Sequence, residues 1–333
     1  MTSAVKVFTV FFALLLLQCK SEVKLNGFAM GTTWSVRAVT DIDSATLEDS
    51  VKKEIERVED IFSNWREQSE LSRFNKHQST TPFAVSRDFY IVMNVALQVA
   101  RDSNGAFDPA ISELIEQAGF GVSKGSTKAV AANRNSWKKI SVTESSGKYY
   151  LQKSDPAITL NLSAVAKGYA VDAVYLILKL KKIDNFLVEI GGEVRSAGLS
   201  RSEKPWRVGI EEPDPDAHKI HSVLEISEMS VATSGGYRNF KKDKNKTSIH
   251  ILDPHSGQSV QNDILSVSII SPNCTYADAL ATAVMVMGKE KGLQMLKNYR
   301  DTDALILYRE GDSVKELSSA GMKNYLENSS SAK

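Results

Sequence analysis

The sequence predicts an α+β fold, in which mixed helices pack against a largely antiparallel sheet. Two observations support this prediction. Residues 46–66 and four later segments place apolar side chains at spacings of three and four, the period of a helix with one buried face. Residues 206–270 instead contain short runs rich in β-branched residues, separated by Pro, Gly, Asn and Asp clusters. Helices and strands come in mixed order, which excludes the regular βαβ alternation of a parallel sheet.

Five helices are expected. The clearest covers residues 46–66, where the apolar positions recur at helical spacing at Leu47, Val51, Ile55, Val58, Phe62 and Trp65. The second runs through SRDFYIVMNVALQVARDSNG, with Ser86 as its N-cap and Gly105 as its stop. The third begins near Ser163. The last two cover residues 275–287 and 289–298.

Strands are expected in segments bounded by turn residues: the end of GFAMGTTWSVRAV, FLVEIGGEV, WRVGI, SVLEI, SVATS, SIHIL, ILSVSII and DALILYR. The chain has no convincing internal repeat. It also has no linker rich enough in Pro, Gly or Ser to mark a domain boundary. We therefore expect residues 27–328 to form a single domain, followed by a frayed tail at residues 329–333.

The charge balance argues against a nucleic-acid partner. The chain has 333 residues, of which 42% are hydrophobic, and its 41 Lys and Arg nearly equal its 40 Asp and Glu. A nucleic-acid-binding protein normally carries a basic excess that neutralises phosphates. The hydrophobic content is that of an ordinary globular protein with a sizeable core.

The N-terminal segment is predicted to be a targeting signal. VFTVFFALLLL has about the length of a signal-peptide apolar region and is short for a membrane span. It leads into Leu16-Leu17-Gln18-Cys19, which resembles a bacterial lipoprotein processing site, although Gln18 departs from the usual small residue. The alternatives are an uncleaved anchor or an ordinary signal peptide with an incidental cysteine.

On the lipoprotein interpretation, residues 1–18 are removed, Cys19 carries lipid and residues 19–26 form a tether. The protein is then exported and anchored to a bacterial membrane, on the periplasmic side. The only other cysteine, Cys274, has no intrachain partner. We expect it to be a small packed residue, since disulfide-stabilised secreted proteins have more cysteines.

The segment TYADALATAVMVMG places Asp278 and Thr282 four residues apart, on one face of a predicted apolar helix. One interpretation is structural: Thr275 and Asp278 form a capping box, and Thr282 bonds back to a carbonyl of the preceding turn. The other is a divalent-cation site. Asp and Thr oxygens one turn apart are hard ligands that suit Mg²⁺.

Three other motifs are individually weak. GAFDPAI contains Asp108-Pro109, an Asp followed by a Pro, which is also typical of a capped helix start. NLSAVAKGYAVD contains Lys167, which either serves a phosphate or extends to solvent. In SIHILDPHSG, His250 alternates with apolar neighbours and is either a base or ligand, or an ordinary surface histidine.

Glycine-rich turns follow two predicted strands, in EIGGEV and ATSGGYR. Such turns expose backbone N–H groups to an approaching anion. Neither matches a phosphate-loop or dinucleotide-binding fingerprint, and HExxH and CxxC pairs are absent from the chain.

The order of the motifs is more specific than any one of them. The series AMGTTW, SELSRFN, GAFDPAI, NLSAVAKGYAVD, EIGGEV, WRVGIEEP, ATSGGYR, HILDPHSG and ADALATAVMVMG resembles the ApbE family of FAD:protein FMN transferases. The resemblance covers nearly the whole chain after about residue 27. It implies an ApbE-like architecture, related to the T-fold.

The resemblance also implies an activity. Family members depend on Mg²⁺, are frequently exported lipoproteins, and transfer the FMN half of FAD to a Thr hydroxyl of a target protein, releasing AMP. The acceptor is commonly a flavin-carrying subunit of a redox complex. Some members instead hydrolyse FAD to FMN and AMP, and a flavin-binding lipoprotein without turnover is a third possibility.

Specific roles follow from the resemblance alone. Asp278 and Thr282 match the side-chain metal ligands, and Ala164 matches a position whose backbone carbonyl contacts the metal. His250 matches the histidine implicated in activating the acceptor hydroxyl. The implied FAD-binding positions are Met30, Trp65, Ala106, Phe107, Asp108, Asn161, Lys167, Leu252 and Ala281.

One position departs from the family pattern. The family usually has Asp where this chain has Asn161, which keeps an acceptor oxygen but loses a charge. This leaves the choice between transfer and hydrolysis open.

Overall fold

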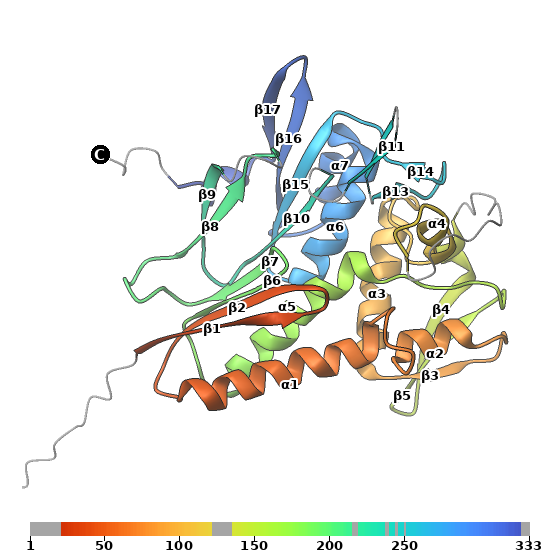
Figure 1. Ribbon diagram of the computed structural model, residues 1–333, viewed down its shortest axis with the longest axis horizontal. Helices are drawn as coiled ribbons and strands as arrows, with labels where there is room; N and C mark the ends of the chain where they lie inside the picture. Colours follow the sequence, from red (N-terminus) through yellow and green to blue (C-terminus); the bar gives the residue numbers. More distant parts are fainter. Residues whose placement is uncertain are drawn as a thin grey trace, which may run out of the picture.

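An eight-stranded antiparallel sheet forms the centre of the fold (Figure 1), with the strand order β1-β2-β6-β7-β10-β15-β16-β17. The computed structural model describes residues 21–121, 135–214, 219–236, 240–243, 246–249 and 251–327. The sheet strands are β1 (Ser21–Ala29), β2 (Thr32–Thr40), β6 (Phe186–Ile190), β7 (Glu193–Ala197), β10 (Ser230–Gly235), β15 (Ile264–Ser271), β16 (Asp303–Glu310) and β17 (Ser313–Ser318).

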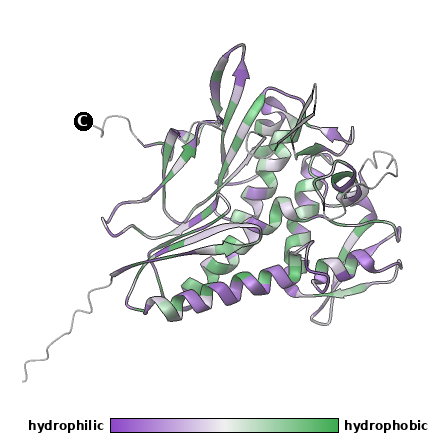
Figure 2. Cartoon of the chain, viewed as in Figure 1, coloured by the Kyte–Doolittle hydropathy of each residue, from purple (hydrophilic) through white to green (hydrophobic). Residues whose placement is uncertain are grey.

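Helices α5 and α6 pack against this sheet. α5 contacts β6 and β7, and α6 contacts β10 and β15. In the hydropathy view, α5 and α6 are hydrophobic along most of their length, whereas α1 alternates between hydrophobic and hydrophilic positions (Figure 2). The helices are α1 (Ser44–Phe62), α2 (Glu70–Lys76), α3 (Arg87–Asp102), α4 (Ser112–Gln117), α5 (Ser163–Leu180), α6 (Cys274–Met287) and α7 (Lys289–Leu296), with two short 3-10 helices at Ser136–Lys139 and Met322–Asn324.

A hairpin covers part of the opposite face of the sheet. Its strands β8 (Trp206–Glu211) and β9 (Ile220–Ile226) enclose a second, smaller core with the sheet residues Val231 and Ile270. Because neighbouring residues of a strand point to opposite faces, β15 supplies Ile269 to the main core and Ile270 to the smaller one.

Smaller sheets complete the described part of the chain. A three-stranded sheet has the order β3-β5-β4, and two hairpin-like pairs join β11 to β12 and β13 to β14. Their strands are β3 (Phe83–Val85), β4 (Ile140–Ser145), β5 (Lys148–Lys153), β11 (Phe240–Asp243), β12 (Lys246–Ile249), β13 (Leu252–Asp253) and β14 (Gln258–Ser259). No helix in the described part of the chain is both long and apolar enough to span a membrane.

The predicted α+β class, with a largely antiparallel sheet, is confirmed. Ser86 caps α3 as expected, its hydroxyl accepting from the N–H of Phe89, and α5 begins at Ser163. α1 is shorter than expected, since it ends at Phe62 and leaves Trp65 in the following turn.

The expected tether is wrong. Ser21–Ala29 forms β1, an edge strand that pairs residue by residue with Thr32–Thr40, so the folded part begins well before residue 27. Most side chains of this segment are polar, and Leu25 is its one buried residue. The segment forms a strand because pairing with β2 satisfies its backbone N–H and C=O groups. Residues 1–20 and 328–333, with the predicted signal peptide, Cys19 and the tail, lie outside the described residues.

The capping box predicted for α6 is also wrong. The N-cap is Asn273, whose side chain accepts from the N–H of Tyr276. Thr275 donates its hydroxyl to Asp172 of α5 instead, at 2.6 Å. The start of α6 is therefore determined by a neighbouring helix as well as by its own sequence.

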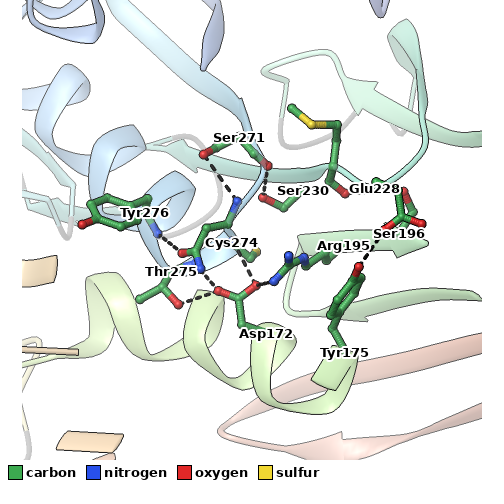
Figure 3. Close-up of polar contacts among 12 residues, drawn as sticks. Asp172, Tyr175, Arg195, Ser196, Glu228, Ser230, Ser271, Cys274, Thr275 and Tyr276 are labelled. Atoms are coloured by element: carbon green, nitrogen blue, oxygen red, sulfur yellow. Dashed lines mark hydrogen bonds and ion pairs between the residues drawn. The ribbon is translucent and has the colours of Figure 1, made fainter. Parts of the chain in front are cut away.

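Asp172 joins three parts of the fold (Figure 3). Its carboxylate accepts from the N–H of Cys274 at 3.1 Å and of Thr275 at 2.8 Å, two groups that a helix start leaves without internal partners. It also pairs with Arg195 of β7 at 2.5 Å. The guanidinium of Arg195 in turn stacks on Tyr175, 3.8 Å from the ring centroid.

Glycine at position 168 lets α5 and α6 approach closely. A Cβ there would lie 2.3 Å from the carbonyl oxygen of Cys274 and 2.8 Å from Cβ of Asp278. The backbone N–H of Gly168 donates to Asp278 at 3.0 Å. One glycine and one carboxylate thus fix the spacing and the register of the two helices.

We predict that Asp172→Ala destabilises the protein by about 3–5 kcal/mol, because it leaves the half-buried Arg195 and two helix N–H groups without their partner. Urea unfolding followed by circular dichroism measures the change. Asp49→Ala, which removes an exposed ion pair with Lys53, is the matched control and should leave the free energy of unfolding close to that of the wild type. Equal losses in the two variants would contradict the role given to Asp172.

Candidate functional site

A cavity of about 1190 Å³ opens where the β1–β2 turn, the end of α1, the start of α5 and the middle of α6 meet. A cavity of this size holds a large cofactor-sized ligand. Its wall brings together residues that are far apart in the sequence. From the expected set it includes Met30, Trp65, Ala106, Phe107, Asp108, Asn161, Ala164, Lys167, Leu252, Asp278 and Thr282.

A buried charge cluster lies in the cavity wall. The ammonium of Lys167 is 3.0 Å from Oε1 of Glu193 and 3.8 Å from Oδ1 of Asp278. Lys167 therefore does not simply extend to solvent. When all three groups are ionised, the cluster has one negative charge in excess, so it favours a cationic ligand.

Burial controls the titration of this cluster. It raises the pKa of Glu193 to about 8 and raises the pKa of Asp278, in both cases against the effect of the nearby ammonium. Burial alone would lower the pKa of Lys167, but the charges of Asp278 and Glu193 outweigh it and the pKa is raised. Lys167 is consequently cationic throughout the physiological range.

Oxygen atoms from three segments face one region of the wall. Asp278 contributes its carboxylate, and Oγ1 of Thr282 lies 3.1 Å from the hydroxyl of Ser234. Ala164 lies in the first turn of α5 and lines the cavity, and a backbone carbonyl has two lone pairs, so its carbonyl can accept one helical hydrogen bond and still contact a ligand. The predicted back-bond of Thr282 is replaced by its contact with Ser234.

This donor set fits a hard divalent cation. Oε2 of Glu193 is buried and has no hydrogen-bond partner among the described residues, so the wall contains an acceptor that the protein does not satisfy. Carboxylate, hydroxyl and carbonyl oxygens are the ligands that Mg²⁺ prefers. Among the described residues, no three His, Cys, Asp or Glu side chains gather at one point, so hydroxyl and carbonyl oxygens have to contribute.

The glycine-rich turns border the cavity as expected. Gly191 and Gly192, between β6 and β7, have φ of 63° and 99°, which favour glycine. A Cβ on Gly191 would lie 2.8 Å from the methyl carbon of Thr32. Gly235, at the end of β10, also lines the cavity. Backbone therefore reaches the cavity where side chains would obstruct it.

The β1–β2 turn is held at the cavity edge. Met30 and Gly31 have φ of 53° and 73°, as in a two-residue hairpin turn. A left-handed conformation costs a non-glycine residue about 1–2 kcal/mol. The N–H of Met30 donates to Oε1 of Glu59 at 2.9 Å, which helps to stabilise the turn. Nearby Trp65 is 69% exposed at the cavity rim, so its ring is available to a ligand.

Asp108 is another buried acid in the lining of the cavity. It accepts from the N–H of Ala110 at 2.8 Å and of Trp137 at 3.2 Å, and no helix begins at the following Pro109. Burial raises its pKa to about 6 although these donors oppose the shift. The helix-start interpretation of this motif is wrong: Asp108 organises a loop beside Phe107.

Comparison with known proteins identifies the family. A model of the ApbE family matches residues 30–306. The chain belongs to the ApbE family. A relative in Vibrio cholerae, named FAD:protein FMN transferase, is 35% identical over 94% of this chain and 96% of its own length. A relative of the same name in Escherichia coli K12 is 30% identical over 91% of this chain and 88% of its own.

Solved ApbE structures share the fold. The flavin transferase ApbE from Vibrio cholerae has a TM-score of 0.80 and 35% identity, over 92% of this chain and all of that one. The flavinyl transferase ApbE of Pseudomonas stutzeri, in its apo form, has a TM-score of 0.80 and 28% identity, covering 92% and 96% of the two chains. The predicted ApbE-like architecture is confirmed.

Two positions carried over from the family, Ala281 and His250, are not among the described residues that line the cavity. Ala281 is fully buried in the main core and does not line the cavity, because α6 turns that position toward its packing partners. Its assignment as a FAD-binding position stays a prediction. His250 lies outside the described residues, although Ile251, which follows it, lines the cavity.

Sequence analysis missed two residues of the ApbE-family cavity. Glu193 follows the EIGG turn, and an acid after two glycines in a strand gives no sign of burial beside Lys167. Ser234 is one of several hydroxyl residues in β10 and contacts Thr282 only through the fold. The glycine-rich turns containing both residues were the available signal.

We predict that Asp108→Asn flattens part of the pH dependence of stability. The folded-state pKa of about 6 lies above the ordinary 3.8, so the folded state binds the proton more tightly. The wild-type protein therefore loses stability as pH rises through this window, by about 3 kcal/mol. Urea unfolding of both proteins near pH 4 and near pH 7 measures the difference. A difference that does not change with pH would contradict this origin.

Proposed function

We propose that this chain transfers the FMN moiety of FAD to a threonine hydroxyl of a target protein, with Mg²⁺, and releases AMP. The observation that carries the proposal is the cavity, which gathers a flavin-sized space, a lysine and a face of oxygen ligands. Relatives named FAD:protein FMN transferase, similar over most of the chain, support it.

The residues of the cavity suit the parts of FAD. Phe107, Met30 and the exposed Trp65 offer apolar surface to its ring systems. The permanently cationic Lys167 and the backbone at Gly191 and Gly192 suit the pyrophosphate, since ammonium groups and glycine turns both favour phosphate oxygens.

Asp278, Thr282 and the carbonyl of Ala164 would hold the cation. When bound, a divalent cation supplies positive charge to the pyrophosphate oxygens while AMP departs. Lys167, held beside Asp278 by Glu193, adds positive charge to the same region. Glu193 and Asp278 are buried, so their attraction for the ammonium of Lys167 is stronger than it would be in bulk water.

In the transfer step, the oxygen of the acceptor threonine forms a bond to the FMN phosphorus, and the bond from that phosphorus to the AMP oxygen breaks. We assign to His250 the removal of the threonine proton, since a neutral imidazole suits general-base catalysis near neutral pH. The position of Ile251 in the cavity wall supports this assignment.

Hydrolysis of FAD to FMN and AMP is the second candidate, with water in place of the threonine. The identity of residue 161 is the reason to retain hydrolysis as an alternative to transfer. Its side chain accepts from the N–H of Ser163 at 3.0 Å, at the entrance to α5, so it is engaged in local structure without the charge that the family usually has there. We further propose that the protein is exported and lipid-anchored through Cys19, and that the acceptor belongs to a redox complex.

An acceptor assay tests the activity. Incubation with FAD, Mg²⁺ and a flavin-acceptor protein should release AMP and leave the acceptor covalently fluorescent, with little AMP when the acceptor is omitted. His250→Ala should slow this transfer by about 10²–10⁴-fold and preserve FAD binding. His221→Ala is the control, because His221 pairs with Glu316 outside the cavity.

AMP release without an acceptor would instead support the hydrolase. Tight FAD binding with no AMP under either condition would overturn both enzymatic proposals. Loss of FAD binding in His250→Ala would point to a structural role for that residue.

We predict that Thr282→Val raises the Mg²⁺ concentration needed for half-maximal AMP release by at least about tenfold. Valine keeps the shape of the side chain but removes the oxygen. Thr282→Ser keeps the oxygen and should remain near wild type, and Asp278→Ala should abolish metal-dependent turnover. If the Mg²⁺ dependence of Thr282→Val is unchanged, and its urea unfolding matches that of the wild type, Thr282 is excluded as a ligand.

A further inference from the structure

The chain enters the fold at the end of the sheet that lies away from the cavity. Ser21, the first described residue, pairs with Thr40, whereas the Met30–Gly31 turn at the other end of the same hairpin lines the cavity. From Thr32 to Thr40 the strand rises about 26 Å. In Figure 1 the start of β1 and the tip of the β1–β2 hairpin lie at opposite ends.

Helix α5 spans the same separation independently. Ala164, in its first turn, lines the cavity, and Leu180 is its last residue. The rise between these two positions is about 24 Å. The chain then turns into β6, where the carbonyl of Asn185 accepts from the N–H of Val39, close to the partner of Ser21. The end of α5 and the start of β1 therefore share one end of the molecule.

Three leucines are left uncovered at this end. Leu176 and Leu180, one turn apart on α5, are 58% and 78% exposed, and Leu199 is 40% exposed. The N–H of Leu199 donates to the side chain of Asn185 at 2.8 Å, which places its loop beside the same strand end. Leucine side chains gain free energy when they leave water, so this group favours a covering surface.

Charge does not explain the surface. Both signs of charge are present around it: Lys181 and Lys182 follow Leu180, and the exposed Asp184 and Asp41 offset them, while Lys179 pairs with Glu228. A surface that binds by electrostatic attraction to anionic lipid would show a basic excess. The contact that these leucines favour is therefore apolar.

We propose that the surface formed by Leu176, Leu180 and Leu199, here called the leucine end, lies against the membrane that holds the lipid on Cys19. The proposal rests on the lipid anchor suggested for Cys19. Only Lys20 separates Cys19 from Ser21, so the anchor lies within about 7 Å of the start of β1. The occupant of the surface is thus the lipid bilayer itself, which the short connection keeps beside the leucine end.

This placement has a functional consequence. With the leucine end on the bilayer, the cavity lies about 25 Å farther out, beyond the headgroup region, where a water-soluble FAD and the acceptor protein reach it. The rigid sheet and α5 act as a spacer between the anchor and the cavity.

Fluorescence quenching on the full-length lipidated protein tests the proposal. The protein is reconstituted in vesicles of phosphatidylethanolamine and phosphatidylglycerol that contain a doxyl-labelled lipid. An environment-sensitive dye is attached to Leu180→Cys or, as the matched control, to Phe28→Cys. Phe28 is 74% exposed at the cavity end of the same hairpin. Cys274 is buried, so it does not compete for the label.

We expect the lipid to quench dye at position 180 by at least about twofold and to leave dye at position 28 unquenched, in high salt as well as low. Equal quenching at both positions, or none at position 180, would overturn the proposal, as would the absence of lipid on Cys19 by mass spectrometry. A dye at Leu199→Cys should also be quenched, and Leu176→Glu with Leu180→Glu should abolish that quenching. None of these outcomes alters AMP release in detergent, which tests the proposed activity separately.

Discussion

The close contact between α5 and α6 is the constraint on which the rest of the site depends. Gly168 allows the helices to approach until a backbone N–H reaches the carboxylate of Asp278. One turn further along α5, Asp172 holds the first residues of α6. Any larger residue at 168 would separate the helices and move Asp278 away from Ala164 and Lys167.

The same contact explains why charged groups are tolerated in the interior. A buried carboxylate is costly unless hydrogen bonds and opposite charges compensate for its lost hydration. Asp172 has four donors. The cluster around Lys167 is compensated less completely, since one oxygen of Glu193 has no partner among the described residues. The better satisfied carboxylate supports structure, and the incompletely satisfied cluster lies in the cavity wall.

The fold also places the cavity and the entry point of the chain at opposite ends of the same elements. The hairpin of β1 and β2 and the helix α5 both extend from the cavity to the end where the chain enters. Both are regular elements that keep their length because their backbone hydrogen bonds are internal or paired. A rigid connection of this kind keeps a binding cavity at a fixed distance from an attachment point.

The sequence by itself determined the fold class, most helices and eleven of the residues that line the cavity. Periodicity is a local property, so α3 and α5 were found with their starts, and the order of nine motifs indicated the ApbE family. The tertiary structure alone decided which polar residues meet. Capping rules assigned Thr275 to its own helix, but a carboxylate from α5 binds it. Glu193 became part of the cavity because β7 packs against α5. Polar β1 became a strand because β2 pairs with it. Contacts between distant segments depend on packing geometry, which no short stretch of sequence contains.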